Sequence, residues 1–235
     1  MKSSTTAGLH FSRRVIPAAV ATVLLALGAS MPAQAATAET PDWSEATKFW
    51  TEYGVDAAIQ ASLLDNLESG IFPDSMTGGE VVSTYEVITD EATSTVATYE
   101  DGSIFVTSTE TPVEGTAGRG VSGCTVSSYT GVTYYTGCRI SGQAGLVGLS
   151  FVTSFIIVNS SYDQISNSGA TPQSSCAGCT STQPTMTYYK AVENSGGPAT
   201  LQYATQWTSI PPVASGTVVL TLSVGGNSYS TPVVG

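Results

Sequence analysis

The stretch Leu-Ser-Phe-Val-Thr-Ser-Phe-Ile-Ile-Val at residues 149–158 decides the fold class, because it is the most apolar segment in the second half of the chain. Its aromatic and β-branched residues favour strands, and it predicts a central strand. Short segments rich in Ser, Thr, Val and Tyr surround it, with turn signals between them and no helical stripe. The expected strands lie near residues 123–129, 133–141, 145–158, 160–166, 185–192, 199–208, 216–224 and 227–233. This pattern predicts a β-sandwich or barrel of about eight strands.

Upstream of this region, the chain predicts two helices followed by a meander. Apolar residues recur at helical spacing in two ranges, 43–53 and 55–67. Three strand-like segments follow at residues 80–90, 93–100 and 103–110. The last two flank Asp101-Gly102, a strong hairpin signal. The expected fold class is therefore α+β and mostly β, with two N-terminal helices and a three-stranded meander followed by a β-sandwich of about eight strands.

Charge divides the chain into two regions. Residues 39–114 hold 16 acids and one base, whereas residues 115–235 hold only two acids, Asp163 and Glu193, and three bases. The Gly- and Thr-rich stretch between them has the composition of a linker. We therefore expect an acidic helix-helix-meander region at 36–111, a linker at 112–122 and a disulfide-stapled sandwich at 123–235.

Residues 1–35 have the features of a signal peptide. A basic start precedes an apolar stretch at 18–27, and Ala33-Gln34-Ala35 matches a small-x-small cleavage site. The apolar stretch is shorter than the roughly 20 residues that span a bilayer. We expect cleavage after Ala35 and a secreted, extracellular protein with no membrane contact in its mature form. Arg13-Arg14 leaves both the general secretory and the twin-arginine routes open.

Removal of the predicted signal peptide leaves 4 basic residues against 18 acidic residues, a net charge of −14. Binding to nucleic acid depends on Lys and Arg that neutralise phosphates, and anionic membrane surfaces attract basic segments. The charge therefore excludes both as partners of the mature chain.

The four cysteines predict disulfides, because an exported protein meets an oxidising environment. We expect Cys124 to pair with Cys138 across the turn at Gly131, and Cys176 to pair with Cys179. The two cross-paired arrangements stay open. The Cys-x-x-Cys segment lies among Ser and Thr with no helix after it, which favours a structural bridge over a redox site or a zinc site.

The only histidine, His10, lies in the predicted signal peptide. The mature chain therefore cannot use Ser-His-Asp or Cys-His catalysis, and we expect no metal, no cofactor and no catalytic residues of those classes. Glycoside hydrolysis stays possible, since two carboxylates suffice for it. Asp163 and Glu193 are the only acids of the sandwich region, and the sequence does not show whether they approach each other.

Aromatic residues on the expected strands are the candidates for ligand binding. They are Tyr134, Tyr135, Tyr188, Tyr189, Tyr203 and Trp207. Strand alternation places one ring of each adjacent pair outside, where it can stack on a sugar or polymer face. The same residue types are also common in sandwich cores.

Four segments of the chain carry a resemblance to known sequences. They are Phe49–Asp56 (FWTEYGVD), Tyr99–Ser103 (YEDGS), Tyr135–Cys138 (YTGC) and Val224–Ser228 (VGGNS). In these segments the chain resembles a set of uncharacterised, secreted, β-rich proteins of actinobacteria. The resemblance implies export and β architecture, and it implies no catalytic residue.

The expected function is that of a released extracellular, non-catalytic binding or interaction protein, whose partner is a polysaccharide, a cell wall or a protein. The enzyme alternative is a carboxylate-dependent extracellular glycan hydrolase. A third possibility is that residues 36–114 act as an acidic pro-region for the β domain.

Overall fold

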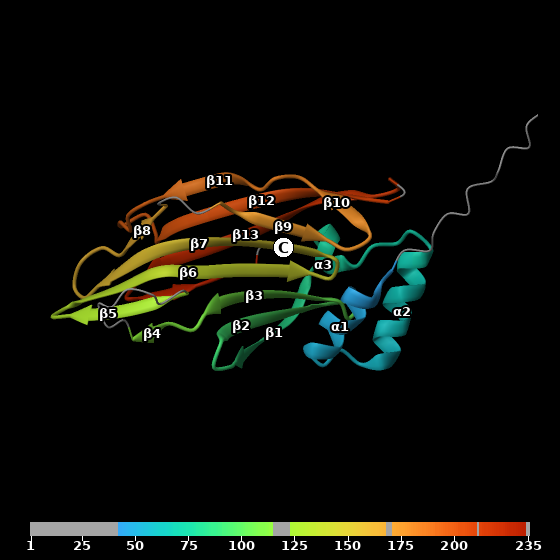
Figure 1. Cartoon of the computed structure of the whole chain (residues 1–235), viewed down its shortest axis with the longest axis horizontal. Coiled ribbons are helices and arrows are strands. Elements are labelled where there is room, and N and C mark those ends of the chain that lie inside the picture. Colours follow the sequence, from blue (N-terminus) through green and yellow to red (C-terminus); the bar gives the residue numbers. More distant parts are fainter. Residues whose placement is uncertain (1–41, 115–122, 168–170, 211, 234–235) are drawn as a thin grey trace, which may run out of the picture. The chain divides into compact units, whose positions relative to one another are not determined.

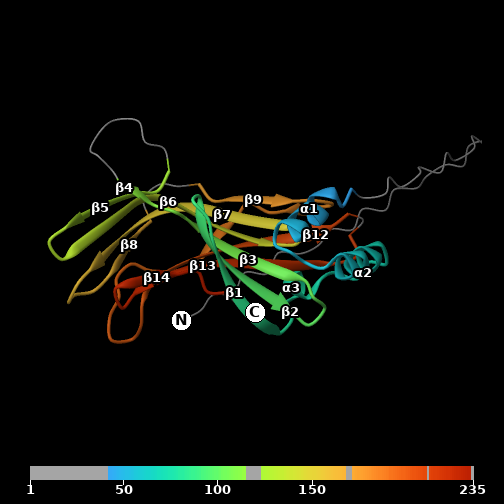
Figure 2. The ribbon, with the colours of Figure 1, turned by 90° about the horizontal axis from the view of Figure 1, so that it is seen from below.

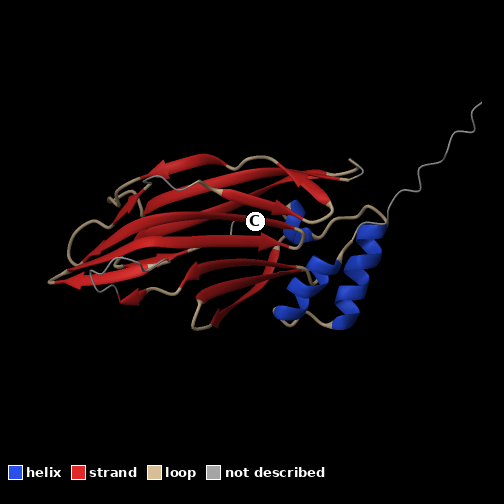
Figure 3. Cartoon of the chain, viewed as in Figure 1, coloured by secondary structure: helices blue, strands red, loops and turns tan. Residues whose placement is uncertain are grey.

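A computed structural model describes residues 42–114, 123–167, 171–210 and 212–233. The predicted signal peptide and most of the predicted linker lie outside these ranges. Strands predominate and the few helices lie together, so the chain is α+β and mostly β, as the sequence predicts (Figure 1, Figure 3). The helices are α1 (Ser44–Glu52), α2 (Ala57–Glu68) and α3 (Asp74–Thr77).

The strands form two sheets. The nine-stranded sheet contains β1 (Val81–Ile88), β2 (Ala92–Tyr99), β3 (Ile104–Glu110), β4 (Val113–Glu114), β5 (Thr125–Tyr129), β6 (Val132–Ala144), β7 (Val147–Val158), β8 (Gln164–Ser166) and β9 (Gln173–Cys176). The five-stranded sheet contains β10 (Cys179–Ser181), β11 (Thr185–Lys190), β12 (Ala199–Ser209), β13 (Ser215–Gly225) and β14 (Ser228–Ser230). Pairing is antiparallel except between β4 and β5.

Strand β7 is the central strand that residues 149–158 predict. It pairs with β6 along one edge and with β8 and β9 along the other. Its side chains alternate strictly between buried and half-buried positions. The buried set faces the second sheet, and the half-buried set faces outward, because a strand directs successive side chains to opposite faces.

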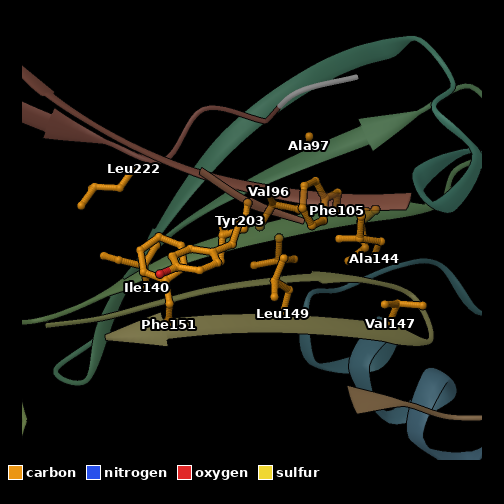
Figure 4. Packing of buried hydrophobic residues seen from close by; sticks show 14 of the residues in the cluster. Val96, Ala97, Phe105, Ile140, Ala144, Val147, Leu149, Phe151, Tyr203 and Leu222 are labelled. Atoms are coloured by element: carbon orange, nitrogen blue, oxygen red, sulfur yellow. The ribbon is translucent and has the colours of Figure 1, made fainter. Parts of the chain in front are cut away.

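The core lies between the two sheets. Phe151 of β7 packs against Tyr203 of β12 with 5.0 Å between ring centroids. Leu149 and Ile140 from one sheet and Leu222 from the other are also buried in this layer (Figure 4). Each such side chain contributes about 1.5–3 kcal/mol through burial, so this inter-sheet layer provides much of the stability.

The meander β1–β3 belongs to the large sheet, which the sequence alone did not show. Residues 105–109 of β3 pair with residues 140–144 of β6. The opposite end of the same edge of β6, residues 132–136, pairs with β5. A bulge between Tyr135 and Cys138, with Gly137 at φ +67°, separates the two halves of β6. The periodicity of side chains predicts where a strand lies, but the neighbouring strand depends on contacts between distant segments. The sequence therefore did not show that β3 pairs with β6.

The helices lie at one end of the two sheets (Figure 2, Figure 3). The Asp56 carboxylate caps α2 by accepting a hydrogen bond from the Ala58 N–H at 2.8 Å. Trp50 of α1 is fully buried, and its ring approaches Gly145 in the β6–β7 turn. None of the helices in the described part of the chain is long and apolar enough to cross a membrane.

Both expected disulfides are confirmed. Cys124 pairs with Cys138, and Cys176 pairs with Cys179. Cys138 lies on β6, and Cys124 immediately precedes β5, so the first bridge staples the two strands of one hairpin. The second closes the short connection between β9 in the large sheet and β10 in the small one.

Candidate functional site

A row of small polar side chains crosses the outer face of the nine-stranded sheet. Its members pair directly with one another across five strands, in the order Ser94, Ser108, Ser141, Ser150, Gln173. We call these residues the serine row. Neighbouring strands lie about 4.8 Å apart, so the row spans about 19 Å at regular steps. Ser150 belongs to the half-buried set of β7, which places the row on the face that points away from the second sheet.

The serine row forms the floor of a groove, which we call the serine groove. One hollow of about 310 Å³ lies between the strand β9 on one side and Phe49 of α1 and its C-cap residue Tyr53 on the other. A second hollow of about 810 Å³ continues on the other side of Tyr53 toward Tyr85 of β1. Tyr53, Ser108 and Ser141 line both hollows, so the two hollows adjoin at Tyr53 and together form the serine groove.

Several polar groups of the groove have no partner within the described ranges. They are the hydroxyls of Tyr53, Ser141 and Ser175 and the side-chain amide of Gln173. Elsewhere in the row, the Ser94 and Ser108 hydroxyls bond to each other at 2.7 Å. Gly148 keeps the floor open, because a Cβ there would lie 2.6 Å from the Ser175 hydroxyl oxygen. The groove thus offers donors and acceptors at fixed positions to a ligand.

Tyr85 holds the end of α1 against the sheet. Its hydroxyl donates a hydrogen bond to the Tyr53 carbonyl oxygen at 2.9 Å. Burial, and to a lesser extent the neighbouring Tyr53, raises the pKa of Tyr85 above its ordinary value. The phenol therefore stays protonated at neutral pH and keeps this contact.

The charge of the groove is negative at one end. Glu52, Asp90 and Glu91 line the second hollow, and no basic residue is among the lining residues of either hollow in the described part of the chain. Arg139 lies beside the row, with its Nη1 at 3.5 Å from the Ser150 hydroxyl oxygen. An anionic ligand would meet like charge at the acidic end, so the groove favours an uncharged one.

The fold brings Asp163 and Glu193 together, which the sequence left open. Asp163 is fully buried, and its two carboxylate oxygens accept hydrogen bonds from the N–H groups of Val158 at 2.7 Å and Asn227 at 2.9 Å. Glu193 accepts from the N–H groups of Asp163 at 3.1 Å and Gly226 at 3.0 Å. Both acids therefore fasten turns to each other, and neither oxygen of Asp163 is available to a substrate.

Three of the six aromatic candidates lie on the inner faces of the two sheets, where each packs against another ring. Tyr135 stacks on Phe155 with centroids 4.5 Å apart, and Tyr203 packs on Phe151. Trp207 is 1 % exposed and packs against Phe72. Alternation places these rings on the inner faces, where Tyr203 and Trp207 are buried and Tyr135 is half-buried.

The other three candidates do not form one site. Tyr134 faces outward from the nine-stranded sheet, Tyr188 faces outward from the five-stranded sheet, and the Tyr189 hydroxyl donates to the Ile165 carbonyl oxygen at 2.9 Å. Tyr134 shares its face with the serine row, but its partner Ile156 is six residues from Ser150 along β7, or about 20 Å. It pairs edge-to-face with Tyr129 at 5.9 Å between centroids.

Sequence reasoning missed the serine row and Tyr53. The serines stand alone among other Ser and Thr residues in a chain rich in both, so nothing distinguishes them until the strands are in register. Within the described residues, no group of three His, Cys, Asp or Glu side chains could hold a metal ion.

Comparison with protein-family models, with curated proteins and with solved structures found no match for this chain. The chemistry of the serine groove therefore carries the functional proposal.

Proposed function

We propose that this chain is a released extracellular protein that binds an uncharged, hydroxyl-rich polymer, such as a polysaccharide, in the serine groove without catalysis. The observation that carries the proposal is the serine row, which lies beside Tyr53 with unpaired hydroxyl and amide groups. Sugar hydroxyls both donate and accept hydrogen bonds, as serine hydroxyls and the glutamine amide do. An extended sugar chain presents such groups at steps comparable to the spacing between strands.

Charge supports a neutral ligand over an anionic one. Acidic side chains flank the groove, and the whole chain has a formal net charge of −11. A polymer that carries carboxylates, sulfates or phosphates would be repelled on approach. Tyr53 is half-buried at the centre of the groove and offers an aromatic wall on which a sugar ring can stack.

Export through a signal peptide at residues 1–35 is part of the proposal. Two disulfides support it, since such bridges form and persist in oxidising compartments. The resemblance to secreted actinobacterial proteins stays a prediction. The hypothesis that residues 36–114 are a pro-region is less well supported. Their removal would take β3 away from β6 and expose the backbone groups of residues 140–144.

The test is co-sedimentation of oxidised protein, residues 36–235, with insoluble polysaccharides and isolated cell walls, with an assay for released sugar. Ser141→Val fills the middle of the groove with a side chain that strands accept. Ser223→Val is the matched control, since Ser223 is half-buried on the outer face of the other sheet. We expect the wild-type protein and S223V to be retained on the polymer. S141V should bind at least about tenfold more weakly, which corresponds to a loss of about 1.4 kcal/mol in binding free energy.

Equal retention of S141V and wild type would refute the serine groove as the binding site, and no retention on any polymer would refute polymer binding. Release of sugar, lost when an acid is replaced by its amide, would instead support the hydrolase alternative. Asp163→Asn and Glu193→Gln are the first such variants to assay, although the backbone hydrogen bonds of Asp163 give both residues a structural role.

A further inference from the structure

A separate pocket lies on the inner face of β1–β3, on the opposite side of these strands from the serine groove. It has a volume of about 550 Å³, within the range of small-molecule sites. Its floor comes from the three strands, and its roof is the chain segment 229–233, which comprises the end of β14 and the residues after it. We call it the threonine pocket. Its floor is lined by Val81, Thr84, Glu86, Thr93, Thr95 and Thr109.

The roof of the threonine pocket is fastened to the large sheet. The Thr107 hydroxyl donates to the Thr231 carbonyl oxygen at 2.9 Å, and the Thr231 hydroxyl donates to the Thr107 hydroxyl oxygen at 3.0 Å. Both residues are buried. Tyr229 packs against Phe155 and Tyr135, at 4.9 Å and 5.3 Å between centroids. The pocket is therefore formed before any ligand arrives, which lowers the entropic cost of binding.

The walls combine apolar surface with unpaired hydroxyls. Val81, Pro232 and Val233 supply the apolar part. Four threonines of the floor, Thr84, Thr93, Thr95 and Thr109, have side-chain hydroxyls with no hydrogen-bond partner among the residues that the structure describes. A few convergent polar groups in an otherwise apolar hollow are typical of small-molecule sites.

Glu86 gives the pocket its charge. Among the described residues it is the only charged one in the lining, and it makes no ion pair with any of them. We infer that the threonine pocket binds a small organic amine, with its apolar body between Val81 and Val233 and its ammonium group at the Glu86 carboxylate. This site is independent of the proposed polymer binding, since it lies on the other face of the sheet.

The experiment uses the oxidised protein and three matched probes, 2-phenylethylamine, 2-phenylethanol and 3-phenylpropanoate, with affinities measured by calorimetry. We expect the amine to bind and the alcohol to bind about fivefold more weakly, because an exposed ion pair contributes at most about a factor of five in affinity. The carboxylate should bind least, since it has the same charge as Glu86. Glu86→Gln should remove the difference between amine and alcohol. Thr95→Val, which keeps the shape and removes a hydroxyl, should weaken both.

Two control variants separate this site from others. Thr98→Val alters the opposite face of β2 and should leave all three affinities unchanged, and so should Ser141→Val in the serine groove. Absence of amine binding, equal binding of the carboxylate, or an amine preference that survives Glu86→Gln would each overturn the inference. If the wild-type protein is retained on no polymer but still binds the amine, only the proposed function is refuted.

Discussion

Replacement of Asp163 by asparagine should destabilise the protein strongly, although the two side chains have nearly the same shape. Asp163 is 0 % exposed, and each of its carboxylate oxygens accepts a backbone N–H, from Val158 at 2.7 Å and from Asn227 at 2.9 Å. An asparagine offers one carbonyl oxygen and one NH₂ group. One backbone N–H would therefore face a second donor in a site that is closed to bulk solvent.

The magnitude follows from these two contacts. A hydrogen bond to a charged acceptor contributes about 1.5–3 kcal/mol, and a buried donor without a partner costs about 1–3 kcal/mol. Asparagine at position 163 loses one of the two hydrogen bonds and weakens the other, because its carbonyl oxygen carries no charge. The variant also no longer buries a charged carboxylate, and this gain offsets part of the lost stability. We expect the free energy of unfolding to fall by about 2–4 kcal/mol. That is a large fraction of the roughly 5–15 kcal/mol that stabilises a typical domain.

The assay is urea denaturation of the oxidised protein, followed by tryptophan fluorescence. Asp65→Asn is the control, because Asp65 is exposed on α2 and its side chain makes no hydrogen bond with the described residues. Glu193→Gln should have an intermediate effect, since Glu193 accepts two backbone N–H groups but is only half-buried. A loss below about 1 kcal/mol for D163N would show that the carboxylate does not fasten the turns as the geometry indicates.

Two further predictions concern the disulfides and the phenol of Tyr229. Loss of the Cys124–Cys138 bridge, which closes a loop with a sequence separation of 14, should lower the free energy of unfolding by about 3 kcal/mol. Loss of the Cys176–Cys179 bridge, with a sequence separation of 3, should lower the free energy of unfolding by about 2 kcal/mol. Urea denaturation of the two double Cys→Ser variants shows which bridge contributes more to stability. Burial, with a smaller effect of Tyr135, raises the pKa of Tyr229 above 10.0 in the folded state. The unfolded state therefore loses the proton first, and stability should decline as pH rises above about 10, less steeply in Tyr229→Phe. Identical alkaline declines in wild type and this variant would contradict the assignment.

Local patterns along the chain predicted the strands of the core well. The apolar, aromatic and β-branched residues at 149–158 predicted a central strand, and the turn at Gly131 between two strand-like segments indicated the Cys124–Cys138 pairing. These predictions succeed because strand propensity and the geometry of a hairpin depend on residues near one another in sequence.

Features that depend on distant pairing could not be read in this way. Side-chain alternation predicted one outward ring in each tyrosine pair, but it did not show that Trp207 and Tyr203 face the core. It also did not show that residues of β3 and β6 meet, or that Asp163 and Glu193 share one set of turns. Strand partners are set by burial and hydrogen bonding across the whole molecule.

The amino-acid sequence was enough to predict a mostly β chain and to favour two short-range disulfides, and its only histidine lies in the predicted signal peptide. The serine groove and the threonine pocket depend on register. A shift of one residue in any strand would turn its side chains to the opposite face and break the row from Ser94 to Gln173. Because that register results from packing between segments far apart in the chain, both sites become visible only in the assembled sheets.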